Sequence, residues 1–143
     1  MPSLSSQLLA EIHAACFETP RPWSAQEFDS LLSMKGVFLV TGEGPSFALG
    51  RYVPHECELL TLAVAPEARG RGFGRAMLRA YEKEADRRIA LKSFLEVAED
   101  NAVAISLYRA EGYSESGRRK HYYTRPDRSK IDALIFTKRI KHT

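Results

Sequence analysis

A short glycine-rich segment is the first place where the sequence could do chemistry. It reads Arg69-Gly70-Arg71-Gly72-Phe73-Gly74-Arg75 and lies where a predicted strand ends and a predicted helix begins. Glycines let successive backbone N–H groups approach an anion, the helix N-terminus offers unpaired donors, and arginines add charge-assisted hydrogen bonds. The segment therefore predicts an anion site into which a pyrophosphate would fit.

The same glycines are compatible with three alternatives. A plain turn that caps a helix needs no ligand. A Walker loop requires Lys-Ser or Lys-Thr after its last glycine, and Arg75-Ala76 stands there instead. A Rossmann fingerprint follows the first strand and needs an acidic residue at the end of the next one, whereas three predicted strands precede this loop and Glu96 lies inside its strand. Both nucleotide motifs are therefore disfavoured, and the plain turn stays open.

Three polar residues further along are candidates for chemistry, and each could equally have a plain structural role. Glu96 lies in an otherwise apolar strand, where a carboxylate is costly to bury unless it has a partner or a purpose. An ion pair or an exposed edge accounts for it as well as a catalytic base does. Asn101 can cap the helix that follows. Tyr108 lies on that helix at a spacing typical of core packing.

The elements that must position these residues follow a regular order. Apolar residues at helical spacing predict a first helix, and after a break at Pro20 and Pro22 a second helix begins with Ser24 as N-cap and Glu27 three residues later. Strands are predicted at residues 37–41, 46–52, 56–65, 93–98, 113–123 and 131–140, and further helices at 72–88 and 101–112. The order ααβββαβαββ predicts an α/β fold, a mixed sheet flanked by helices, in a single domain over residues 1–143.

Composition narrows the classes of function. Of 143 residues 44% are hydrophobic and 27% charged, and no apolar run approaches the about 20 residues that cross a bilayer. No secretory signal is visible, so we expect a soluble cytoplasmic protein that does not bind membranes. A net charge of +3 does not indicate nucleic-acid binding. The basic run Arg118-Arg119-Lys120-His121 is either a solvated strand end or a contact with a phosphate or an acidic partner.

The cysteines and histidines give no sign of a metal site. Cys16 and Cys57 have no partner at metal-ligand spacing, so we expect two buried small hydrophobic side chains and no bound metal. The histidines are scattered along the chain with no nucleophile motif around them, and we expect them at the surface without a catalytic role. They are His13, His55, His121 and His142.

The glycine-rich segment resembles the acetyl-CoA signature of the GNAT acetyltransferase superfamily, Arg/Gln-x-x-Gly-x-Gly/Ala, with Arg69, Gly72 and Gly74 in its fixed positions. The resemblance covers nearly the whole chain. Shorter stretches are similar to the RimI type, bacterial enzymes that acetylate the N-terminal alanine of a ribosomal protein: Pro22-Trp23-Ser24, Leu95-Glu96-Val97, Asn101 with Ala104-Ile105, Leu107-Tyr108, Gly112-Tyr113 and Tyr122-Tyr123. The resemblance implies the GNAT fold, with a mostly antiparallel sheet, and an acetyl-CoA-dependent N-acetyltransferase.

The resemblance also implies how acetyl-CoA is held. It assigns the pyrophosphate to residues 70–75, with Arg69 beside them. The strand before the loop would run along the pantetheine arm and offer backbone groups to it. The side chain of Asn101 would also contact the pantetheine arm. The strand residues concerned are Leu62, Ala63 and Val64.

Catalytic roles follow from the same resemblance. Glu96 would accept the proton of the attacking amine, directly or through water, and Tyr108 would donate a proton to the departing thiolate. Glu58 is a reserve base, because some histone-type GNAT enzymes carry theirs on the strand before the loop. Tyr122 and Tyr123 would lie near the peptide entrance, although a surface aromatic pair accounts for them equally well.

The acceptor is less closely specified than the donor. An α-amine with a pKa of about 8 is roughly 10% neutral at pH 7, whereas a lysine near 10.4 is neutral in well under about 0.1% of molecules. A modest base therefore suffices for a protein N-terminus. A small amine such as an antibiotic or a polyamine stays possible, and so does a noncatalytic acetyl-CoA-binding module. Residues 4–34 and 122–131 would shape the acceptor pocket.

Overall fold

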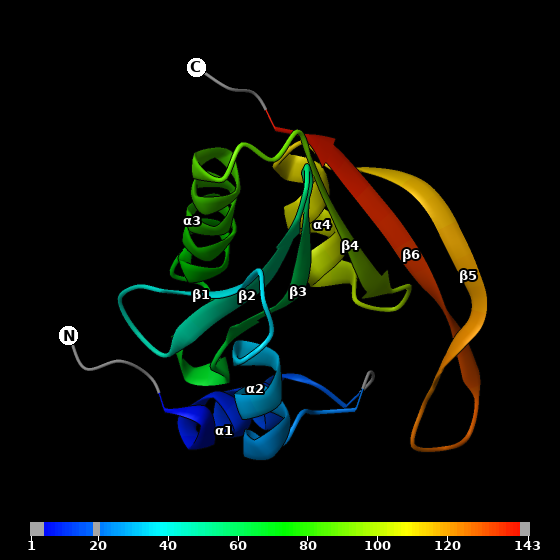
Figure 1. Cartoon of the computed structure of the whole chain (residues 1–143). Coiled ribbons are helices and arrows are strands. Elements are labelled where there is room, and N and C mark those ends of the chain that lie inside the picture. Colours follow the sequence, from blue (N-terminus) through cyan, green and yellow to red (C-terminus); the bar gives the residue numbers. More distant parts are fainter. Residues whose placement is uncertain (1–4, 19–20, 141–143) are drawn as a thin grey trace.

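A six-stranded sheet in the order β1-β2-β3-β4-β6-β5 forms the centre of the structure (Figure 1). The computed structural model describes residues 5–18 and 21–140. The strands are β1 (Val37–Thr41), β2 (Ser46–Val53), β3 (Glu56–Val64), β4 (Lys92–Ala98), β5 (Ser114–Thr124) and β6 (Lys130–Arg139). The helices are α1 (Ser6–Cys16), α2 (Ala25–Leu32), α3 (Phe73–Arg87) and α4 (Ala102–Ala110), with a short 3-10 turn at Pro66–Ala68.

The predicted order of elements and the α/β fold are confirmed. Local capping accounts for the agreement, since Ser24 and Glu27 form the reciprocal capping box that starts α2. Asn101 caps α4 by accepting a bond from the Ala104 backbone at 3.2 Å. Gly112, with a φ of 97°, follows the end of that helix. Pro20, part of the predicted break between the first helices, lies outside the described residues.

The only parallel pairing in the described sheet joins β3 to β4, and it is short. It runs from Glu56 opposite Lys92 to Glu58 opposite Phe94, whereas β3 continues to Val64 and β4 to Ala98. Figure 1 shows the two strands diverging from this point. The far halves of β3 and β4 therefore face each other without strand-to-strand hydrogen bonds, which opens the middle of the sheet.

Helices cover both faces of the sheet and form two cores. One core lies under α3 and α4 and includes Met77, Tyr81 and Tyr108. The other lies under α1 and α2 and includes Leu9 and Phe28. We call these the α3/α4 face and the α1/α2 face.

A β-bulge in β3 changes which face each of its residues meets. Leu49 of β2 pairs with Thr61 and Gly50 with Leu59, so Leu60 is the extra residue. As a result Leu60 packs in the α1/α2 core while Leu62 packs in the α3/α4 core. The bulge lies in the part of β3 that borders the opening in the sheet.

His13 is buried, so the expectation that it lies at the surface is wrong. Its Nε2 lies 3.1 Å from Thr61 Oγ1, and its Nδ1 accepts a hydrogen bond from the Trp23 backbone N–H at 3.1 Å. The ring stacks on Trp23 at 4.9 Å between centroids. Burial lowers the His13 pKa to about 4, so the neutral ring ties α1 to the segment before α2 and to the bulge of β3. His55 and His121 are exposed as expected, and His142 lies outside the described residues.

Candidate active site

The glycine-rich loop (residues 69–75) connects the end of β3 to the start of α3 and presents free backbone donors. Gly70 and Gly72 both have a φ of 80°, and a Cβ on either would meet no atom within 4 Å. Among the described residues, the backbone N–H groups of residues 70–75 donate no hydrogen bond. Left-handed glycines with open space above them, next to a helix N-terminus, fit an anion such as a pyrophosphate.

The arginines of this loop differ in whether their side chains already have partners within the described chain. Arg69 Nε donates to the Val64 carbonyl at 3.2 Å, which ties the loop to the end of β3. Arg75 pairs with Glu111 at 3.2 Å, so it contributes its backbone N–H to the loop while its side chain is engaged. Arg71 is exposed and has no partner within the described chain. Arg71 is therefore the guanidinium best placed to meet an anion at the loop.

The last residues of β3 border the opening in the sheet. Leu62, Ala63 and Val64 pair with β2 on one side, and no strand of the described chain pairs with them on the other. The Val64 carbonyl also accepts from the Cys16 thiol at 3.1 Å. Their unpaired strand edge is the geometry that backbone recognition of an extended ligand needs.

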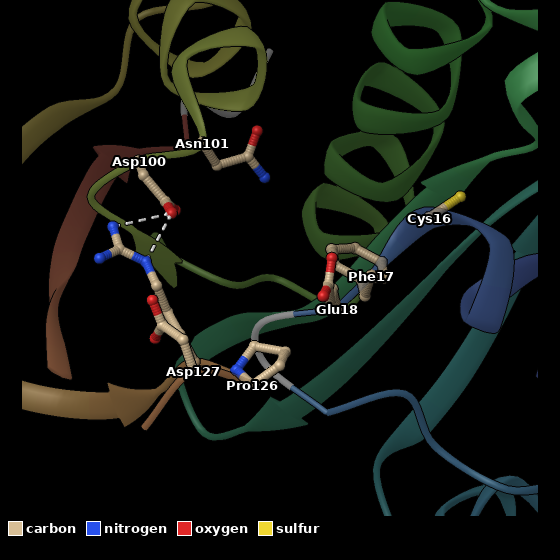
Figure 2. Close-up of a pocket in the computed structure, with 8 residues that line it drawn as sticks. Cys16, Phe17, Glu18, Asp100, Asn101, Pro126 and Asp127 are labelled. Atoms are coloured by element: carbon tan, nitrogen blue, oxygen red, sulfur yellow. Dashed lines mark hydrogen bonds and ion pairs between the residues drawn. The ribbon is translucent and has the colours of Figure 1, made fainter. Parts of the chain in front are cut away.

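An open pocket of about 490 Å³ lies where β4 ends and α4 begins (Figure 2). Three separate parts of the chain line it: the end of α1, the start of α4 and the β5–β6 loop. Its residues are Cys16, Phe17, Glu18, Asp100, Asn101, Arg125, Pro126 and Asp127. The pocket thus brings together residues 16–18 and 125–127, which belong to the two segments expected to shape an acceptor site, residues 4–34 and 122–131.

The pocket has an excess of negative charge. Asp100 pairs with Arg125 at 3.1 Å, the contact dashed in Figure 2. Asp127 accepts bonds from the backbone and hydroxyl of Ser129, and Glu18 has no partner within the described chain. Three carboxylates against one guanidinium favour a cationic occupant.

Asn101 and Cys16 both line this pocket. The Asn101 carboxamide oxygen caps α4, and its amide nitrogen has no partner within the described chain, so capping and ligand binding are compatible. Cys16, expected to be buried, is only half-buried. Cys57 is buried as expected, and burial raises its thiol pKa to about 11.

Glu96 forms an ion pair, one of the roles that its sequence context allows. Leu95 and Val97 point into the α3/α4 core, so Glu96 projects from the α1/α2 face of β4. Its Oε1 accepts from Arg119 Nε on β5 at 2.7 Å, and its side chain is 24% exposed. Arg118 pairs with Glu99 at 2.9 Å and Asp132 at 2.7 Å. The arginines of the basic run therefore contact carboxylates of their own chain.

Glu58 lies at the last parallel pair, on the same face as Glu96. Glu58 is opposite Phe94, and Glu96 is the next residue along β4 with the same orientation. Burial and the negative charge of Glu96 raise the pKa of Glu58, opposed by Arg51 and Arg119. Tyr123 also belongs to this group, because burial, followed by Glu96, raises its pKa to about 12.

Tyr108 lies on the other face of the sheet. Its ring is buried between Tyr113 and Phe136, at 5.9 and 6.5 Å between centroids. Burial raises its pKa, so the hydroxyl is protonated at neutral pH. That hydroxyl has no hydrogen-bond partner within the described chain. The ring fills the core, as its spacing predicts, and its hydroxyl remains available.

Sequence reasoning missed Arg119 as the partner of Glu96 and the acidic lining of the pocket. Arg119 was visible only as part of a basic run. Glu18, Asp100 and Asp127 are far apart in sequence and carry no motif.

In the described chain, no group of His, Cys, Asp and Glu could hold a metal ion, and no helix is long and apolar enough to cross a membrane.

Comparison with known proteins identifies the family. Residues 7–113 match the model of the acetyltransferase (GNAT) family. The chain is 35% identical over 117 residues to the ribosomal protein bS18-alanine N-acetyltransferase of Escherichia coli strain K12, covering 80% of this chain and 78% of that one. It is 35% identical over 127 residues to N-alpha-acetyltransferase RimI of Mycobacterium tuberculosis, covering 82% and 78%.

A solved structure extends the match to nearly the whole fold. The crystal structure of the ribosomal-protein-S18-alanine N-acetyltransferase from Escherichia coli has a TM-score of 0.84 and 30% identity, covering 96% of this chain and 89% of that one. The family resemblance is thereby confirmed. It was inferred from the glycine-rich loop, from Leu95-Glu96-Val97 and from the helix that Asn101 caps. The chain belongs to the GNAT acetyltransferase family and, within it, is an N-acetyltransferase of the RimI type.

Proposed function

We propose that the protein transfers the acetyl group of acetyl-CoA to the N-terminal α-amine of a protein, with the N-terminal alanine of a ribosomal protein as the first candidate acceptor. One observation carries the proposal. The glycine-rich loop with its free backbone donors and the carboxylate-lined pocket both adjoin the diverging ends of β3 and β4, so a phosphate-bearing donor and a cationic acceptor could meet there. The cytoplasmic location expected from the sequence is part of this proposal.

The geometry supports the residues that the family resemblance assigns to acetyl-CoA. The free N–H groups of residues 70–75, with the Arg71 guanidinium, would bind the pyrophosphate. The open strand edge of Leu62 to Val64 and the free amide nitrogen of Asn101 would bind the pantetheine arm. When bound, acetyl-CoA supplies an activated acyl group as its thioester.

We assign the two proton transfers to Glu96 on the α1/α2 face of the sheet and to Tyr108 on the α3/α4 face. Glu96 would take the proton of the acceptor ammonium, directly or through water, which leaves a neutral amine able to form the new C–N bond. As the C–S bond breaks, Tyr108 would give its proton to the departing sulfur. The hydroxyl of Tyr108 carries its proton at neutral pH, as a donor must; burial raises its pKa and makes it a weaker acid, so it would give up the proton only as negative charge develops on the sulfur.

The acidic pocket favours a peptide acceptor with positive charge near its N-terminus. An α-ammonium group and a basic side chain would both be attracted by Glu18, Asp100 and Asp127. A small cationic amine would benefit from the same charges, so the pocket alone does not separate the two classes. The Escherichia coli relative acts by name on the alanine of a ribosomal protein, and the Mycobacterium tuberculosis relative is named as an N-alpha-acetyltransferase, which makes a protein N-terminus the first choice.

The test compares acetyl transfer to peptides that begin Ala-Arg with transfer to the same peptides blocked at the N-terminus, and to a panel of small amines. We expect turnover on free peptides and none on blocked ones. Rapid turnover of a small amine with none on peptides would overturn the ribosomal proposal. Tight acetyl-CoA binding without transfer to any amine would instead indicate a noncatalytic binding module.

A further inference from the structure

A β-bulge interrupts β5 where this strand runs past the end of β4. Arg119 and Tyr123 of β5 pair with the β6 residues on either side of Asp132, so three residues of β5 stand opposite Asp132. The middle one, His121, has a left-handed φ of 53°, which residues other than glycine rarely adopt. Because a bulge takes backbone groups out of the regular ladder, other groups must hold it in place.

The side chain of Asp132 holds the middle of this bulge. Its Oδ1 accepts the His121 backbone N–H at 2.9 Å, and its Oδ2 accepts Arg118 Nη1 at 2.7 Å. The pKa of the Asp132 carboxyl is held below its usual range, first by the bond from His121 and then by that from Arg118, so the group is ionised at neutral pH. Both bonds are therefore charge-assisted.

The bulge decides which side chain lies next to Arg119 on the α1/α2 face. Side chains alternate between the two faces of a strand, so in a regular β5 the next residue on that face would be His121. The two extra residues put Tyr123 there instead. Arg119 pairs with Glu96 at 2.7 Å, and its guanidinium lies 5.5 Å from the centre of the Tyr122 ring. The rings of Tyr122 and Tyr123 meet edge to face at 5.1 Å between centroids.

We infer that Asp132 is a positioning residue for the acceptor side of the reaction: its carboxylate holds the β5 bulge that places Arg119 and the tyrosine pair beside Glu96. This inference rests on the proposed function, in which Glu96 meets the acceptor amine. By strand alternation the Asp132 side chain shares the α3/α4 face with Leu134, whereas Glu96 projects from the other face. Asp132 therefore acts through the backbone of β5 and not by touching the acceptor.

The donor side does not depend on the Asp132 side chain. The Asp132 backbone carbonyl accepts the Glu99 N–H at 3.0 Å, and Asn101 follows two residues later. That backbone contact is compatible with any side chain at this position, and the glycine-rich loop belongs to a separate segment. Substitutions of Asp132 should therefore change the kinetics of the peptide and leave those of acetyl-CoA nearly unchanged.

The test is steady-state acetyl transfer to a peptide that begins Ala-Arg, with peptide and acetyl-CoA varied separately. In Asp132→Ala the His121 N–H loses its partner. The peptide kcat/KM should fall by about 10-fold or more, the factor that one charge-assisted hydrogen bond contributes to holding the bulge. The KM for acetyl-CoA should stay within about twofold of the native value.

Two variants separate the His121 bond from the loss of charge. Asp132→Asn keeps an oxygen that can accept the His121 N–H, so its peptide kcat/KM should be within about threefold of the native value. Glu99→Gln is the matched control, because it removes the other carboxylate paired with Arg118, at 2.9 Å, and leaves the bulge contact intact. It should change neither KM. If Asp132→Ala does not fold, Asp132→Thr replaces it, since threonine suits a strand and its side chain is too short to hold the bulge.

Hydrogen exchange at the His121 amide reports the bulge directly. In NMR spectra this amide should exchange at least about tenfold faster in Asp132→Ala than in the native protein, and nearly as slowly as the native amide in Asp132→Asn. An unchanged exchange rate in a folded Asp132→Ala protein would overturn the inference, because the carboxylate would then not hold the bulge.

Three kinetic outcomes would also overturn it. One is a native-like peptide kcat/KM in folded Asp132→Ala or Asp132→Thr. Another is an equal rise in the KM for peptide and acetyl-CoA, which indicates a general structural role. The third is a loss in Asp132→Asn as large as in Asp132→Ala, which assigns the effect to the pair with Arg118. Failure of the proposed function is distinct, because the native enzyme would then acetylate no free peptide N-terminus, whatever the His121 amide reports.

Discussion

Replacing Gly72 with aspartate should abolish acetyl-CoA binding without unfolding the protein. Gly72 is the N-cap of α3 with a φ of 80°, and a Cβ there meets no atom within 4 Å. The folding cost is therefore the left-handed backbone alone, about 1 kcal/mol, and Asp and Asn tolerate that conformation better than most residues. The fold should survive the substitution.

The loss of binding follows from charge. A carboxylate about 5 Å from a pyrophosphate oxygen repels it by roughly 2–3 kcal/mol at an effective dielectric constant of about 20–40. It also competes for the free N–H groups of residues 70–75, and each charge-assisted bond lost adds about 1.5–3 kcal/mol. The sum corresponds to a loss of affinity of at least about 100-fold.

Gly72→Asn is the matched control, because it has the same shape and backbone preference as aspartate without the charge. Titration calorimetry with CoA should show a much weaker Kd for Gly72→Asp than for Gly72→Asn, and the difference should shrink at high salt. Equal affinities for the two variants would refute the argument, since the loop would then be a turn and not an anion site.

Two other predictions concern single side chains. Tyr108→Phe should lower kcat by about 100-fold or more while leaving the melting temperature and acetyl-CoA affinity nearly unchanged, because the ring contacts remain and the hydroxyl has no partner within the described chain; unchanged kcat would leave Tyr108 as a core residue. For His13, the folded-state pKa of about 4 lies below the unfolded value of 6.5, so its contribution to stability is present above pH 6.5 and is lost as the pH falls to 4. Urea unfolding of the native protein should show a loss of about 3 kcal/mol over this range that is absent in His13→Gln; equal losses in both proteins would mean that other groups cause the acid sensitivity.

Local signals made most of the fold predictable. Ser24 with Glu27, and Asn101 with Gly112, mark helix ends through contacts within a few residues. Apolar runs indicate the strands other than β5, which is polar and mostly exposed. The donor side of the site is equally local, because the glycine-rich loop is one contiguous segment. Its conformation depends on glycines and a helix start that the sequence displays directly.

The proposed acceptor side could not be predicted in the same way, because it depends on non-local strand pairing. The bulge at Leu60 and the early end of the β3–β4 pairing depend on register, which no single segment specifies. Between Arg119 and Tyr123, β5 has two residues more than the facing part of β6, a further shift of register. The Arg119–Glu96 pair depends on how these strands align. The predicted surface position of His13 is wrong because histidine, as a polar residue, is expected to be exposed. Phe17 and Trp23 lie nearby in the sequence, and these aromatic residues could have indicated a buried ring.

The two sides of the site are nevertheless mechanically linked. His13 holds the segment before α2 to Thr61 in the bulge of β3, and Cys16 at the end of α1 donates to Val64 at the end of the same strand. The strand that borders the proposed acetyl-CoA site thus also fixes one wall of the proposed acceptor pocket. The opposite wall, the β5–β6 loop, is joined to the start of α4 by the exposed pair of Arg125 and Asp100. If this pocket holds the acceptor, as proposed, substitutions in the β5–β6 loop should change the acceptor preference while acetyl-CoA binding and the fold stay intact, because the glycine-rich loop lies on a separate segment of the chain.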